Sequence, residues 1–174
     1  VQSAYMLTQE ATQRQVGLLT ETDKIFSQSM EQFCFDVTFW DELVNFAHNP
    51  QKEWADINIG YPTSSYGFSI AWIFDTNFKQ LYGFQTLNID ELSKCFINSD
   101  SLKNKFSQSW FENFCFEKDG AIFQFYGAPI QPSNDTARTT NPNGWMLIGR
   151  VYEGKLLEGM SRITKSDIKI VFPD

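Results

Sequence analysis

The sequence has little of the chemistry that most enzymes and metal proteins need. It holds one histidine, His48, and its three cysteines lie in no CxxC or zinc-ligand spacing. A single histidine cannot build a metal cluster, and no P-loop, GxGxxG, GxSxG or HExxH motif occurs. Asp36 and Asp41 do not suit a glycosidase pair, because they lie about 140° apart around a helix. We therefore expect no enzyme, no metal site and no cofactor.

Positive charge and long apolar runs are also scarce. The chain has 14 Lys and Arg against 21 Asp and Glu, a formal charge of −7. Because phosphate neutralisation supplies most nucleic-acid affinity, we expect no nucleic-acid partner. No window reaches the ~18 to 20 apolar residues of a membrane span.

Both ends of the chain look cut from a longer protein. It opens at Val1 inside a helical pattern, without an initiator Met or a signal peptide, and stops at Asp174 just after an apolar run. We expect the lack of a span to describe this segment alone.

Aromatic residues, by contrast, are abundant, with 17 Phe in 174 residues. They contribute to an apolar stripe with steps of four and three: Phe26, Met30, Phe33, Val37, Trp40 and Val44. Because this spacing keeps side chains on one helix face, we predict a single long helix over residues 1–47 that Asn49-Pro50 ends.

A second, weaker stripe lies on the first half of this predicted helix. Its members are Ala4, Leu7, Ala11, Leu18 and Ile25. Two stripes suit a helix that packs both on its own domain and on a partner copy, as in a coiled coil. We therefore predict a homodimer through the N-terminal helix; packing on one side alone is the other interpretation.

The rest of the chain alternates strand and helix patterns. We predict a helical turn over 51–59 ended by Gly60-Tyr61-Pro62, strands over 67–75, 78–84, 121–129, 144–152 and 167–172, helices over 88–96, 101–116 and 154–163, and a polar surface loop over 131–143. The turn residues Asp75-Thr76-Asn77 join the first two strands, and Asp119-Gly120 leads into the third. Hairpins with clustered helices predict an α+β fold with an antiparallel sheet.

The cysteines allow two interpretations. Cys34, Cys95 and Cys115 are either small buried apolar residues or one disulfide with one free thiol. Sequence spacing does not choose between them.

The candidate ligand site combines acids, aromatic residues and one strand arginine. We predict that it is formed by Asp36, Trp40, Asp41, Trp72, Tyr126 and Arg150. Arg150 is the charged residue within an apolar strand, so it needs Asp36, Asp41 or an anionic ligand. The alternative is a structural Asp41–Arg150 ion pair with Trp40 packed in the core.

The order of these motifs resembles the CHASE domains of the fourth type. The resemblance rests on Asp36 with Trp40-Asp41-Glu42 and Asn45-Phe46, on GFSIAWIFD, and on the closing run from Ala128-Pro129-Ile130 through Gly149-Arg150, within about residues 26–172. It implies a PAS-like or Cache-like fold: a long N-terminal helix packed on a five-stranded antiparallel sheet, with a small-molecule pocket on the other face. The whole chain, 1–174, would be one sensor domain with its core at 66–172.

The resemblance also implies a function. Such domains are periplasmic sensors of histidine kinases and diguanylate cyclases, and the resemblance implies that membrane helices flank this sequence. We expect a small-molecule ligand, with Arg150 suggesting an anion, to act on the 131–143 loop and to signal through the long helix. The alternative functions are a dimerising interaction module without a ligand and a cytoplasmic PAS-like regulator.

Overall fold

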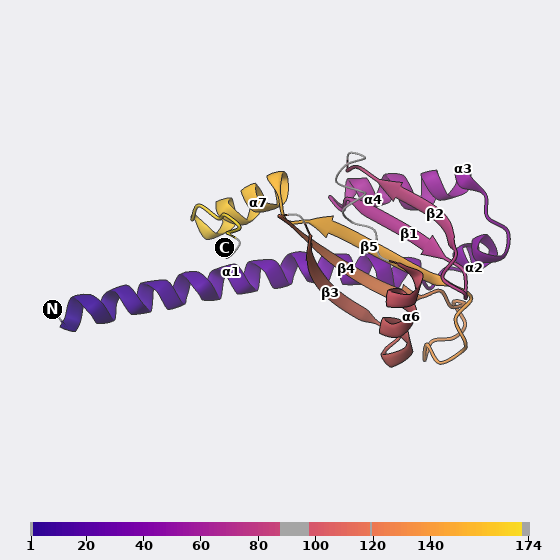
Figure 1. Cartoon of the computed structure of the whole chain (residues 1–174), viewed down its shortest axis with the longest axis horizontal. Coiled ribbons are helices and arrows are strands. Elements are labelled where there is room, and N and C mark those ends of the chain that lie inside the picture. Colours follow the sequence, from indigo (N-terminus) through magenta and orange to yellow (C-terminus); the bar gives the residue numbers. More distant parts are fainter. Residues whose placement is uncertain (1, 88–97, 119, 172–174) are drawn as a thin grey trace. The chain divides into compact units, whose positions relative to one another are not determined.

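The structure is a computed structural model, and it falls into two compact units. It describes residues 2–87, 98–118 and 120–171. Unit 1 contains residues 1–29 and 152–174, and unit 2 contains residues 30–151. Helix α1 (Gln2–Val37) runs through both units (Figure 1). That the whole chain is a single sensor domain stays a prediction, and each unit is described by itself.

A five-stranded antiparallel sheet forms the centre of unit 2. Its strands are β1 (Ile70–Phe74), β2 (Gln80–Gln85), β3 (Glu112–Lys118), β4 (Ala121–Pro129) and β5 (Trp145–Val151). They lie in the order β2-β1-β5-β4-β3, with every neighbouring pair antiparallel. The predicted α+β class, with a long N-terminal helix and a five-stranded antiparallel sheet, is confirmed.

The hairpin between β1 and β2 forms where the turn residues predict it. The Asp75 side chain accepts hydrogen bonds from the backbone N–H groups of Asn77 and Lys79, at 2.8 and 2.9 Å. Phe78 takes a left-handed backbone with φ of 61°. The aspartate thus organises the turn through its own side chain.

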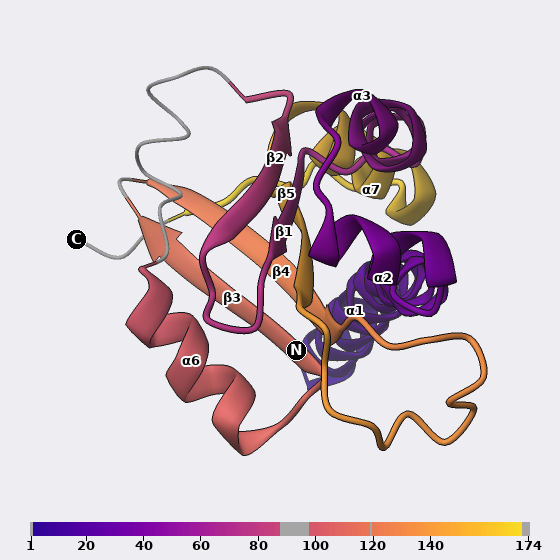
Figure 2. The ribbon, with the colours of Figure 1, turned by 90° about the vertical axis from the view of Figure 1, so that its right-hand side faces the viewer.

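Helices cover both faces of the sheet and enclose two separate cores (Figure 2). On one face, Met30, Phe33, Leu43 and Phe46 from α1 and α2 (Asp41–His48) pack against a strand cluster that includes Ile73, Met146 and Ile148. On the other, Leu102 and Phe106 of α6 (Ser99–Gln108) pack against a cluster that includes Phe125, Trp145 and Leu147. Burying one such large apolar side chain contributes about 1.5–3 kcal/mol.

The predicted helix over 1–47 is broken near its end. Helix α1 ends at Val37, and α2 begins at Asp41 after an extended Trp40 with φ −94° and ψ 133°. The carbonyl of Thr38, in the break, accepts a hydrogen bond from the Gln131 N–H at 3.0 Å. A distant segment therefore uses a carbonyl that an unbroken helix would bond internally. The predicted stop at Asn49 is confirmed.

The helical run after Pro50 is longer than predicted. Helix α3 (Lys52–Ala55) passes through a π-turn (Asp56–Gly60) into α4 (Tyr61–Ser65). Gly60-Tyr61-Pro62 was expected to end the helix, and this prediction is wrong. Pro62 falls in the first turn of α4, where a missing N–H is tolerated.

The predicted helix over 101–116 is half correct. Helix α6 starts two residues earlier, and the Asn98 side chain caps it by accepting a hydrogen bond from the Ser101 N–H at 2.7 Å. From Glu112 the chain becomes β3, an edge strand paired with β4. Phe114 and Phe116 stack on Phe125 and Phe123, and this cross-strand packing favours the strand.

The other predicted elements divide into three groups. The strand over 121–129 and the helix over 154–163 are confirmed as β4 and α7 (Gly154–Thr164). The predicted fifth strand over 167–172 is wrong, since residues 167–171 form no strand. The predicted helix over 88–96 and the first turn residue, Asp119, lie outside the described residues. The sheet reaches five strands through β3 instead.

Unit 1 joins the first part of α1 to α7 and the segment after it. The Tyr152 hydroxyl donates to Asp23 at 2.6 Å, and Ser166 donates to the Gln15 side chain at 3.1 Å. Asp23, three residues before the apolar residue Phe26, thus has a partner. In the part of the chain that the structure describes, no helix is long and apolar enough to span a membrane.

The cysteines differ from one another. Cys34 is fully buried with a free thiol that faces the Met146 carbonyl at 3.7 Å, and burial raises the pKa of this thiol. Cys115 is exposed on β3, so the prediction that it is buried is wrong. Cys95 lies outside the described residues.

Candidate functional site

The segment over 131–143, here called the polar loop, is fastened to α2 at both of its ends. The Asp41 carboxylate accepts hydrogen bonds from the Ser133 N–H at 2.9 Å and from its hydroxyl at 2.8 Å. These two bonds lower the pKa of Asp41. At the other end, His48 shares a hydrogen bond with Asn143 at 3.0 Å. The polar loop therefore follows α2 from its first residue to its last.

Arg138 anchors the middle of the polar loop to the end of α1. Its Nη2 donates to Thr38 Oγ1 at 2.9 Å and to the Pro129 carbonyl at 2.7 Å. The side chain is 8% exposed, whereas the neighbouring Ala137, an apolar residue of the loop, is exposed. The loop is therefore held by a buried cation and not by an apolar residue.

Aromatic rings surround the Arg138 guanidinium. Its central carbon lies 4.9 Å from the ring centre of Phe35, 5.1 Å from Phe39 and 5.5 Å from Phe111. Burial lowers the pKa of Arg138, and its Nε and Nη1 have no hydrogen-bond partner among the described residues. Ring faces attract a cation at these distances, which offsets part of the cost of burying the charge.

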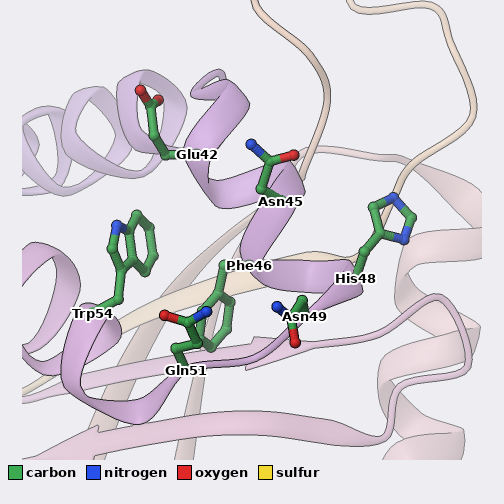
Figure 3. A pocket seen from close by; sticks show the side chains of 7 residues that line it. All are labelled: Glu42, Asn45, Phe46, His48, Asn49, Gln51 and Trp54. Carbon is green, nitrogen blue, oxygen red and sulfur yellow. The ribbon is translucent and has the colours of Figure 1, made fainter.

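A pocket of about 490 Å³ opens between α2 and α3, on the face of the sheet that α1 and α2 cover (Figure 3). It is lined by Glu42, Asn45, Phe46, His48, Asn49, Gln51 and Trp54. The Phe46 and Trp54 rings stack with centres 5.4 Å apart and an interplanar angle of 24°. A volume of this size fits a small molecule.

Four polar side chains of this pocket are exposed and make no contact with other polar groups in the described part of the protein. Among the described residues, no hydrogen bond or ion pair involves the side chains of Glu42, Asn45, Asn49 or Gln51. Three amides and one carboxylate can thus all bind a ligand without breaking a contact within the protein. His48 joins this pocket to the polar loop through Asn143.

Three of the six predicted site residues lie together at the junction of α1 and α2, and all three are exposed. Asp36 accepts a hydrogen bond from Gln32 at 2.8 Å, and Asp41 binds Ser133. Trp40 is 39% exposed and is not buried in the core. The alternative interpretation of Trp40 as a core residue is therefore wrong.

The two predicted aromatic walls lie on opposite faces of the sheet. Trp72 stacks on Phe125, with ring centres 5.3 Å apart, in the core beside α6. Tyr126 lies in the core beside α1, where burial and then Glu31 raise the pKa of its hydroxyl. The structure does not bring these two side chains to one cavity.

Arg150 faces the same side of β5 as Met146 and Ile148, as predicted. Its Nε donates to the buried Gln124 side chain at 2.8 Å. The predicted partner Asp41 binds Ser133, which follows the opposite end of β4. Pro129 lies five positions after Gln124 along β4, or about 17 Å away. The predicted Asp41–Arg150 pair is therefore not formed.

Sequence reasoning missed Arg138 and the Trp54 pocket. Arg138 lies in a stretch without periodicity, and its cage joins rings from positions 35, 39 and 111. Trp54 and Gln51 follow the helix stop at Pro50, and the density of polar side chains from Glu42 to Gln51 was the one available signal. In the described ranges, no group of three or more His, Cys, Asp or Glu could hold a metal ion.

Comparisons with known proteins agree with this geometry. Two crystal structures of the LuxQ periplasmic domain from Vibrio cholerae, one in selenomethionine form, have TM-scores of 0.60 and 0.59. Each is 10% identical to this chain. The matched region covers 88% of this chain, and 70% and 71% of the two LuxQ chains respectively. At this identity the likeness shows the PAS-like fold alone. No curated protein matches the chain.

The family is shown by sequence. A model of the CHASE4 domain matches residues 25–171, from within α1 to beyond α7. Domains of this family are non-catalytic, extracytoplasmic sensor modules of receptors. This chain belongs to the CHASE4 domain family.

Proposed function

We propose that this domain senses a small molecule for a membrane-bound receptor and binds it in the pocket between α2 and α3. The observation that carries the proposal is the set of polar side chains lining this pocket without partners in the described structure. The pocket also has an aromatic wall in Phe46 and Trp54, and a few polar side chains beside an apolar wall are the usual lining of a small-molecule site.

The signal would pass from the pocket to α1 through the polar loop. His48 lines the pocket and bonds Asn143, and Arg138 of the same loop bonds Thr38 just after α1. A ligand that displaces α2 would change these contacts and shift the equilibrium between two positions of α1. The contacts support this route by their continuity; coupling itself is a matter for experiment.

The family supports the remaining parts of the proposal. We propose a periplasmic domain attached through flanking membrane helices, with a histidine kinase or diguanylate cyclase as output. Helix α1 would carry the change toward the membrane, since it runs through both units.

Thermal denaturation of the purified domain with a metabolite panel tests ligand binding. A ligand at a hundredfold excess over its Kd stabilises the domain by about 2.7 kcal/mol. We expect Trp54→Ala to stay folded and to lose this response. Trp40→Ala is the matched control, because Trp40 is an exposed tryptophan outside this pocket.

The same experiment separates the two candidate sites. If Trp40→Ala or Arg150→Ala loses the response and Trp54→Ala keeps it, the ligand binds at the sequence-predicted residues instead. If no compound in a broad panel raises the denaturation temperature of the wild type, ligand sensing by this domain is refuted and the alternative function is favoured.

That alternative is a dimerising module, and one observation favours it. Ala11, Leu18 and Ile25 are exposed and lie seven residues apart along α1, the heptad spacing of a coiled-coil seam. Leu18 is 49% exposed and Ile25 is 64% exposed. We propose that a second copy of this chain covers this stripe, whether or not a ligand binds.

A further inference from the structure

We propose that the pocket between α2 and α3 recognises an organic ammonium cation, such as an amine or a quaternary ammonium compound. This inference rests on the proposed ligand-sensing function and specifies its ligand class. It differs from the anion that Arg150 suggested in the sequence, because Arg150 does not line this pocket.

The charged residues near the pocket favour a cationic ligand. The described residues that line it include one carboxylate, Glu42, and no lysine or arginine. Lys52, the nearest basic residue in sequence to Gln51, is paired with Asp56 at 2.6 Å. The net charge of −7 adds a long-range attraction for cations. An anionic ligand would find no opposite charge in this lining.

The aromatic pair of Trp54 and Phe46 also favours a cation. Trp54 stacks on Phe46 and is partly buried, so one indole is held in place as part of the pocket wall. Figure 3 shows Trp54 and Glu42 on the same side of the pocket, across from His48. Tryptophan binds cations over its ring more strongly than the other aromatic side chains do. The exposed, unpaired Glu42 side chain is free to turn toward a cation held there.

The side-chain amides of the pocket would bind the other polar groups of the ligand. Asn45, Asn49 and Gln51 offer donors and acceptors on the remaining wall, and their side chains have no partner in the described ranges. They suit hydroxyl or amine groups a few bonds from the cation. The lining thus matches a compact cation with one or two further polar groups.

Nuclear magnetic resonance titration of the whole domain tests this inference. Choline and putrescine are the cationic probes, and 3,3-dimethyl-1-butanol is the uncharged isostere of choline. We expect both cations to shift the Trp54 indole N–H signal and the amide signals of Asn45 and Gln51, and the isostere to bind about fivefold more weakly. Raising the salt concentration should weaken the cations alone.

Variants make the outcome specific. We expect Glu42→Gln to weaken the binding of both cations about fivefold, because it removes the opposite charge and keeps the shape. Glu53→Gln is the matched control, since Glu53 is an exposed α3 glutamate outside the pocket lining, and it should bind as the wild type does.

Each other outcome has a defined meaning. If a neutral sugar or an anion such as citrate shifts the Trp54 signal while choline and putrescine do not, the cation inference is overturned and the pocket remains a ligand site. Equal affinity of choline and its isostere, or of Glu42→Gln and wild type, also overturns it. If neither the cations nor the wider panel binds, both this inference and the proposed function fail.

Discussion

Arg138 donates a hydrogen bond to Thr38 Oγ1 at 2.9 Å across 100 positions of sequence. Thr38 lies in the break between α1 and α2, and the Gln131 N–H bonds its carbonyl at 3.0 Å. The polar loop thus holds this one residue through both its side chain and its backbone. This double attachment connects the loop to the helix that runs through both units.

Replacement of the caged arginine should destabilise the domain. Arg138→Ala removes two hydrogen bonds from a charged donor and the contacts with three rings. We expect the free energy of unfolding to fall by about 2–4 kcal/mol, measured by urea denaturation.

Two further variants separate charge from packing at this position. Arg138→Met keeps an unbranched side chain among the rings, so its free energy of unfolding should fall less than that of Arg138→Ala. Thr38→Val removes one acceptor and should cost about 1 kcal/mol. If Arg138→Met is as stable as the wild type, the guanidinium contributes nothing and the anchoring role is wrong.

The polar loop should make stability depend on acid pH through Asp135. This carboxylate accepts hydrogen bonds from the Thr140 hydroxyl at 2.7 Å and from the Thr140 and Thr139 N–H groups, which lower the pKa of Asp135. A lowered folded pKa gives stability that is present above the unfolded pKa of about 3.9 and is lost as pH falls through the folded pKa. Stability should therefore decrease from near pH 4 downward.

Asp135→Asn checks the origin of this slope. The amide cannot titrate, so the pH dependence of the urea midpoint should be shallower than in the wild type below pH 4. The two proteins should differ most near neutral pH. A variant with an unchanged slope would show that the acid sensitivity arises at other carboxylates.

Two glycines should respond to alanine with opposite signs. A methyl group at Gly149 would lie 2.6 Å from an atom of the Phe125 ring, which is itself fully buried. We expect Gly149→Ala to cost about 1–3 kcal/mol through overpacking. Gly17 lies inside α1 with nothing within 4 Å, so Gly17→Ala should raise helix stability by up to about 1 kcal/mol.

Thermal and urea unfolding of both variants measures these effects. Stabilisation by Gly149→Ala would mean that the Phe125 ring moves aside without cost. A loss of stability in Gly17→Ala would mean that a partner molecule contacts α1 at this position, because the space around Gly17 is open within a single chain.

The exposed stripe on α1 should set the oligomeric state. If a second copy covers Leu18 and Ile25, the double variant Leu18→Glu, Ile25→Glu should place charges in the seam and shift the protein to monomer. Sedimentation velocity at several concentrations measures the change. Gln13→Glu, on an exposed position about 140° around the helix from Leu18, is the control and should stay dimeric. A wild type that is monomeric throughout refutes the dimer.

Local sequence patterns predicted those strands and turns whose apolar runs and turn residues are uninterrupted. The apolar run from Ile70 to Phe74 is fully buried, and the Asp75 turn follows it. The segment after Trp110 was harder to predict, because Phe106, Trp110 and Phe114 keep a four-residue step after the helix has ended. The alternation of Phe114 and Phe116 with polar residues was the competing signal for a strand.

The site was less predictable, because its residues meet through the fold. Arg150 was placed on the correct face of its strand, and its Nε donates to the neutral Gln124 oxygen, whereas the expected partner Asp41 binds Ser133. A buried guanidinium needs acceptors, and a carboxylate is one among several. The Arg138 cage depends on the approach of segments about 100 residues apart, and no local spacing encodes that approach.

The sealed Cys34 thiol bears on how an exported protein folds. Disulfide exchange requires a thiolate that can reach another sulfur, and this sulfur is fully enclosed with its proton held by burial. Oxidants outside the cytoplasm would thus react with Cys34 during the interval before the core closes. Once the core has closed, burial of Cys34 therefore protects its thiol from disulfide exchange.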